Sequence, residues 1–184
     1  AGTNTLTLTE TGTTTLTAVN LANVTNWAIW VLASNAGYSL TLNTANAGTG
    51  ALAITATAVT TPGNLSKIDA AAETDGGTIA LTVATGALDT VAAILTGGSG
   101  SDTLKFSGGG ITLDATELGS VTAWETWTLL SNAAYTLTLA DANIAANATL
   151  TIDASALTSA AATVSAAAEN SSGARLNYTG GGGA

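Results

Sequence analysis

The chain has 184 residues, of which 46% are hydrophobic and only 8% charged, and its formal net charge is −9. This charge disfavours nucleic acids and anionic membranes as partners, and the absence of Cys and His excludes disulfides, thiolate or imidazole metal sites and Ser–His or Cys–His catalysis. Thr, Asn and Gly interrupt every apolar run well before the roughly 18–20 residues of a membrane span, so none is expected. The opening residues 1–4 (AGTN) are typical of strand and turn rather than of a signal peptide.

Short segments in which apolar residues alternate with polar ones, mostly Thr, follow one another along the chain, and each predicts a β-strand. In chain order their apolar positions are Leu6/Leu8, Tyr38/Leu40/Leu42, Leu52/Ile54, Ile79/Leu81/Val83, Leu104/Phe106, Ile111/Leu113, Tyr135/Leu137/Leu139 and Leu150/Ile152. Gly, Asn, Asp and Ser cluster between them, as turns require. The Ala-rich residues 70–73 and 166–169 are compatible with either a helical turn or a tight coil. The pattern therefore predicts an all-β fold.

An internal repeat divides the chain into two units. Residues 24–42 (VTNWAIWVLASNAGYSLTL) and 121–139 (VTAWETWTLLSNAAYTLTL) are identical at 12 of 19 positions. Chance would give only about two or three identities in a chain of this composition. We therefore expect two tandem repeats of about 90 residues, 1–96 and 97–184, within one continuous domain.

Regular short strands can build a sandwich, a barrel or a solenoid. The tandem repeat, the single-file apolar rows and the single proline, Pro62, favour a right-handed parallel β-solenoid, in which like residues stack on one another. Neither end shows a polar helix or a charge-rich strand that would blunt an exposed sheet edge. We therefore expect the ends to stack on another copy or on flanking repeats of the same chain.

One glycine-rich motif carries a candidate metal site. Gly97, Gly98, Gly100 and Asp102 fit the nonapeptide G-G-x-G-x-D-x-U-x at residues 97–105. In this motif the glycines allow a tight turn with inward-facing carbonyl groups, and the aspartate supplies a hard oxygen ligand for calcium. Calcium needs about six to eight oxygens, so a second turn would have to stack on the first. The alternative is a glycine turn in which Asp102 caps its own backbone.

The motif also carries a resemblance. Residues 96–104 (TGGSGSDTL), together with 69–77 (DAAAETDGG) and 137–157 (LTLADANIAANATLTIDASAL), resemble the Thr/Ala-rich β-solenoid stretches of large secreted repeats-in-toxin (RTX) proteins of Gram-negative bacteria. The resemblance implies export, a calcium-rich exterior and a structural or adhesive role. Carried over by position, it implies that Gly97, Gly98, Gly100 and Asp102 form the calcium turn.

All four tryptophans fall in two W-x-x-W motifs at equivalent sites of the repeats, Trp27/Trp30 and Trp124/Trp127. Exposed rings would suit the stacking of sugars. The favoured interpretation is packing, because large aromatic side chains fill cores and interfaces, here among many small residues.

Two other functions, ice binding and carbohydrate cleavage, are less consistent with the sequence. Thr-x-Thr pairs can order water as an ice-binding face, but their spacing here is irregular. The carboxylate pairs Asp114/Glu117 and Glu73/Asp75 would be needed for lyase or glycosidase chemistry, but only three basic residues exist to support it, and solvated turn carboxylates are favoured. The sequence therefore predicts a structural, non-enzymatic protein of the bacterial surface that assembles end to end. The alternative is a calcium- or glycan-binding module of a larger exported adhesin.

Overall fold

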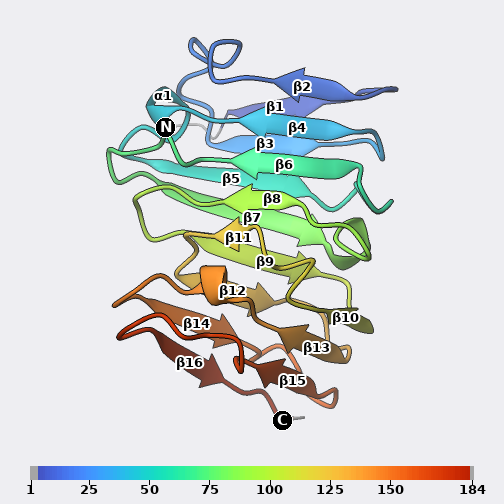
Figure 1. The fold of residues 1–184 in the computed structure, drawn as a ribbon. Coiled ribbons are helices and arrows are strands. Elements are labelled where there is room, and N and C mark those ends of the chain that lie inside the picture. The colour runs from blue at the N-terminus through green and yellow to red at the C-terminus, as the bar shows by residue number, and fades with distance from the viewer. Residues whose placement is uncertain (1–3, 183–184) are drawn as a thin grey trace.

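The computed structural model describes residues 4–182 as a stack of short parallel strands (Figure 1). One sheet contains β1 (Thr5–Leu8), β3 (Ile29–Leu32), β5 (Ala51–Ala56), β7 (Thr78–Ala84), β9 (Thr103–Ser107), β12 (Thr126–Leu129), β14 (Thr149–Asp153) and β16 (Arg175–Thr179), in that order. A second contains β2 (Thr14–Leu16), β4 (Tyr38–Thr41), β6 (Leu65–Asp69), β8 (Ile94–Thr96) and β11 (Val121–Thr122), and a third contains β10 (Ile111–Leu113), β13 (Tyr135–Thr138) and β15 (Ala162–Ser165). The helical segments of the described residues are α1 (Thr44–Ala47), η1 (Thr85–Ala87) and η2 (Asp141–Asn143).

The chain winds as a β-solenoid of about seven turns, which confirms the predicted all-β parallel architecture. Each strand of the eight-stranded sheet pairs in parallel with the strand one coil later; Thr5, for example, lies beside Ile29, and Ile29 lies beside Ala53. Most coils contribute one strand to this sheet and one to the opposite face. In Figure 1 the coils run from β1 and β2 (blue) at one end of the stack to β15 and β16 (red) at the other.

The core is a set of apolar ladders between the two faces. Strict alternation turns every second side chain inward, so that buried Leu52, Ile79 and Leu81 alternate with part-buried Ala and Thr. Trp30 lies beside Leu6 on one side and Ile54 on the other, all facing inward. The Ala-rich residues 70–73 and 166–169 form short turns between strands and not helices.

The strands of the two halves take equivalent places, four coils apart. Leu6 of β1 lies beside Trp30, and Leu104 of β9 lies beside Trp127. Tyr38 begins β4, and Tyr135 begins β13. Each half therefore contributes four strands to the long sheet, namely β1, β3, β5 and β7 from the first and β9, β12, β14 and β16 from the second.

The opposite face changes partners at the boundary between the halves. In chain order, β10 is the first strand after β8 on this face, so it would be expected to pair with β8. Instead β8 pairs with β11, where Leu95 lies beside Val121. The strand β10 pairs instead with β13 and opens the three-stranded sheet. One sheet is thus continuous through the whole stack, while the other face is divided.

No helix within residues 4–182 has the length and apolar character needed to cross a bilayer.

Candidate functional site

The glycine-rich turn lies at the boundary, between β8 and β9. No positive φ angle is found at Gly97, Gly98 or Gly100, so these glycines do not supply left-handed backbone. They supply space instead, because a Cβ at Gly100 would overlap the carbonyl oxygen of Gly77 in the preceding coil, and one at Gly97 would overlap Ala123 in the next. The motif therefore lets three successive coils approach closely.

Asp102 ties this turn to the coil before it. The side chain is completely buried, its Oδ1 accepts the backbone N–H of Ile79 at 2.7 Å, and its Oδ2 accepts that of Gly98 at 2.5 Å. Desolvation by burial raises the pKa of the Asp102 carboxyl, and the nearby Glu125 carboxylate adds to this, while the two N–H groups oppose it. Both carboxylate oxygens are engaged by backbone donors, as in the turn-cap alternative.

Two more carboxylates, which sequence reasoning did not assign to this turn, complete the cluster. Glu73 belongs to the preceding coil, and its Oε2 accepts the N–H of Ser99 at 3.2 Å. Glu125 belongs to the following coil, and its Oε2 accepts the N–H of Asp102 at 2.7 Å. Three coils are thus joined by carboxylate–amide hydrogen bonds. The equivalent glutamates in the two repeats, Glu73 and Glu169, were the signal that could have revealed this role. Among residues 4–182, no group of three or more His, Cys, Asp or Glu could hold a metal ion.

Replacing Asp102 with alanine is expected to lower the free energy of unfolding by about 2 kcal/mol, because two backbone N–H groups lose their acceptor. The raised pKa sets the pH dependence. The folded state binds the proton more tightly than the unfolded chain, so the margin of the wild type over Asp102→Ala is largest below the ordinary pKa of 3.8 and shrinks as pH rises through the raised value. Urea denaturation at a series of pH values measures this margin.

Asp114 provides a control of opposite sign. Its exposed carboxylate accepts the N–H groups of Thr116 and Glu117, which lower its pKa. Its contribution is therefore present above pH 3.8 and is lost as pH falls through the lowered pKa. A margin for Asp102→Ala that instead grew as pH rose would contradict the assignment of Asp102 as a desolvated turn cap.

The carboxylate pairs weighed for catalysis also hold turns. Glu117 accepts the N–H groups of Thr90 and Asp114, at 2.8 and 2.7 Å. Glu73 accepts the N–H of Asp75 at 3.1 Å. Asp114 and Glu117 thus each bind the backbone of the other residue, and Glu73 binds the backbone of Asp75.

A pair of buried asparagines, which the sequence analysis missed, repeats the same kind of tie. Asn46 donates both protons of its Nδ2 to the carbonyl oxygens of Leu21 and Val24 in the preceding coil, at 2.8 and 2.9 Å. Asn143 occupies the equivalent place and donates to Leu118 and Val121, at 2.7 Å each. They lie 97 residues apart, each as the third residue of a short helical segment (α1 and η2), and this equivalent spacing is the signal that identifies them.

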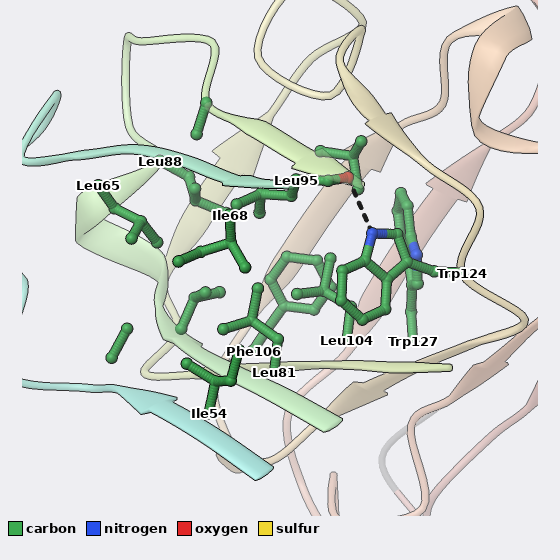
Figure 2. Packing of buried hydrophobic residues seen from close by; sticks show 14 of the residues in the cluster. Ile54, Leu65, Ile68, Leu81, Leu88, Leu95, Leu104, Phe106, Trp124 and Trp127 are labelled. Atoms are coloured by element: carbon green, nitrogen blue, oxygen red, sulfur yellow. Dashed lines mark hydrogen bonds between the residues drawn. The ribbon is translucent and has the colours of Figure 1, made fainter. Parts of the chain in front are cut away.

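The tryptophans lie mainly in the core. Trp30, Trp124 and Trp127 are buried. Figure 2 shows the Nε1 of Trp124 donating to the carbonyl oxygen of Leu95, at 2.9 Å. Trp127 also meets Phe106 edge to face, with ring centroids 5.6 Å apart. Trp27 is only partly buried, because it lies in the first turn of the described stack and no coil covers it there as β8 covers Trp124.

A hollow of about 450 Å³ lies beside Trp27 and is lined by residues 26–28 and 45–51. The equivalent space beside Trp124 is about 40 Å³. Buried Ile144 stands where the first repeat has the smaller Ala47, and the lining also differs at Ala28, where the second repeat has Glu125.

Filling this hollow is expected to stabilise the fold. Ala47→Ile copies the residue of the second repeat and should raise the free energy of unfolding by about 1 kcal/mol, through burial of added methyl groups. The reverse change, Ile144→Ala, should lower it by about 2–4 kcal/mol. Thermal unfolding of both variants tests this; a loss of stability in Ala47→Ile would show that the hollow cannot accept the side chain.

The outward face of the long sheet carries Thr in broken rows. Thr7, Thr55, Thr82, Thr128 and Thr179 share one row, but Val31, Lys105 and Asp153 interrupt it. An ice-binding face would need uniform rows of threonine hydroxyl groups, and this row mixes hydroxyl, apolar and charged side chains.

Together, the fold and the boundary cluster define a parallel β-solenoid whose coils are tied to one another by buried carboxylate and amide side chains. No model of a protein family, no curated protein and no solved structure was found to match the chain.

Proposed function

We propose that this protein is a structural element of the bacterial surface, a subunit or segment of an extracellular fibre, adhesin or surface layer, and that it works by end-to-end stacking of its coils. The observation that carries the proposal is that, among residues 4–182, β1 and β16 each pair on one side only. An unblunted edge strand presents a row of free N–H and C=O groups that can pair with another chain.

The chemistry of the chain supports this role. Most side chains that bind across coils engage backbone groups, and the carboxylates considered as catalytic pairs hold turns. The extracellular, bacterial setting rests on the resemblance of residues 96–104 to RTX proteins. In this proposal the protein serves as a rod that is extended by pairing at its two end strands.

Sedimentation velocity and electron microscopy across a range of concentrations test the proposal. The wild type should form elongated assemblies that grow with concentration. The matched control is Tyr178→Lys, which places a charge on the inward row of β16 at the end of the stack and should remain monomeric, with the same circular dichroism as the wild type. Monodisperse wild-type monomers at all concentrations would overturn the proposal.

A calcium- or glycan-binding module of a larger exported adhesin is the second candidate. The observation that favours calcium is the convergence of Glu73 and Asp102, from adjacent coils, on the turn at Gly98 and Ser99. Calorimetric titration with calcium should then release heat for the wild type and not for Asp102→Ala. No heat and no change in thermal stability would overturn the metal assignment. The hollow at Trp27 is the candidate glycan site, and Trp27→Ala on a glycan array tests it.

A further inference from the structure

We propose that a second copy of this chain docks its β1 onto β16, in the register that β9 has on β7, so that one solenoid continues into the next. This inference rests on the proposed end-to-end stacking and specifies its partner and its alignment. The boundary between the two halves of the chain is the template, because it already joins the end of one repeat to the beginning of another.

The two outer strands occupy the places of the two boundary strands. β16 lies on β14 as β7 lies on β5, with Leu176 beside Leu150 and Ile79 beside Leu52. β1 lies on β3 as β9 lies on β12. The surface that β7 offers to β9 is therefore repeated at β16, and the surface that β9 offers to β7 is repeated at β1.

An unpaired carboxylate oxygen marks the β16 end. Glu169 takes the place of Glu73, and the Oε1 of each accepts the N–H two residues further on. Glu73 Oε2 accepts the N–H of Ser99, from the coil that begins the second half. Glu169 Oε2 is buried but has no partner among the described residues. A buried acceptor without a donor is costly, and a further coil placed on β16 as the coil of β9 is placed on β7 would supply a donor to this atom.

The β1 end carries the complementary acceptor. Asn4 takes the place of Asp102, which accepts the N–H of Ile79 across the boundary. The Nδ2 of Asn4 donates to the carbonyl oxygen of Asn26, and its Oδ1, which accepts no hydrogen bond from the described residues, can accept one from a docked strand. In the docked pair, the donor at the place of Ile79 is the N–H of Leu176. The bond across the boundary is thereby preserved without a buried charge.

The apolar surfaces at the two ends also match. Tyr178 is 41% exposed, whereas Leu81, at the same place in the first half, is fully buried. Leu6 is partly buried, whereas the equivalent Leu104 is fully buried beside Leu81. Docking in the boundary register places Tyr178 beside Leu6 and covers both side chains.

The register predicts which residues of two molecules become neighbours. Ala80 lies beside Thr103 at the boundary, so Asn177 of one molecule should lie beside Thr5 of the next. Both side chains face outward, and neighbouring strands lie about 4.8 Å apart, within the Cα separation that a disulfide accepts. Since the chain contains no cysteine, introduced cysteines report this contact alone.

The experiment compares two double variants of the full chain, oxidised with glutathione disulfide and analysed by non-reducing electrophoresis. Thr5→Cys with Asn177→Cys should give a ladder of covalent multimers. Thr5→Cys with Arg175→Cys, which is displaced by two residues on the same face, should give at least tenfold less. Circular dichroism confirms that both variants fold.

The outcomes separate this inference from the proposed function. Assembly of the wild type combined with equal cross-linking, or with stronger cross-linking of the displaced pair, would overturn the register and leave stacking intact. Monomeric wild type with no cross-linking in either variant would overturn both. A second measurement uses Glu169→Gln, which can place the Nε2 amide group where Glu169 has the unpaired oxygen Oε2. An NH₂ group cannot accept a hydrogen bond from the backbone N–H of the docked coil, so assembly should weaken several-fold. Unchanged assembly would contradict the role given to Glu169.

Discussion

Replacing Asn143 with aspartate should lower the free energy of unfolding at neutral pH by about 3 kcal/mol or more. The change keeps the shape of the side chain but replaces the Nδ2 donor with an oxygen that faces the carbonyl oxygens of Leu118 and Val121. The side chain is nearly completely buried, so water cannot relieve the repulsion. Equilibrium denaturation in urea provides the measurement.

Asn132→Asp is the matched control for this substitution. Asn132 is also bound to the next coil, but it is exposed and donates to the hydroxyl groups of Thr158 and Ser159. These hydroxyls can rotate and donate to a carboxylate, while the oxygen that remains still accepts the same backbone N–H groups. The control should therefore change stability by less than about 1 kcal/mol. Equal losses in the two variants would contradict the role of Asn143 as a buried tie between coils.

Removing the ring of Trp127 should cost about 3–5 kcal/mol. This side chain is fully buried between Leu104 and Ile152 of the neighbouring coils and packs edge to face on Phe106. No smaller neighbour can move in to fill the space left by Trp127→Ala, because strand pairing fixes the coils on both sides. Chemical denaturation monitored by far-ultraviolet circular dichroism measures the loss.

Trp27→Ala supplies the comparison within the same motif. Its ring is only partly buried and borders the hollow, so its removal should cost clearly less than that of Trp127. A larger loss for Trp27 than for Trp127 would show that the outer turn, and not the middle of the stack, depends most on tryptophan packing.

Alternation of apolar residues was sufficient to predict the strands at Leu6/Leu8, Ile79/Leu81/Val83 and Leu104/Phe106. The tandem repeat, together with the single-file apolar rows and the scarcity of proline and charge, was sufficient to predict a solenoid. Eight strands were not among those predicted from alternation, namely β2, β3, β8, β11, β12, β15, β16 and β6, of which β6 shows one physical reason. Its register against β4 shifts between Tyr38 and Ser39, so that Leu65 and Ile68 both face inward at a spacing of three. A bulge of this kind removes the period of two from which strands are predicted.

The candidate site was only partly visible in the sequence. Asp102 and its glycines were found through their motif, but the partners Glu73 and Glu125 lie in other coils, more than twenty residues away. Local spacing carries no information on which turns stack, and the length of the coil varies along the chain. Asn46 and Asn143 escaped for a different reason, because a buried asparagine and an exposed turn asparagine look alike until the carbonyl groups that they bind are known.

The direction of the hydrogen bonds determines how the molecule would respond to tension. The two ends of the described chain lie at opposite ends of the stack, and the strands run across the line that joins them (Figure 1). A force pulling these ends apart would peel one strand from its neighbour at a time, and each coil contacts mainly the coils next to it. Such a rod should lengthen in steps at low force, as one coil after another unfolds. When the force is released, it should shorten again as coils refold onto the part of the stack that is still folded.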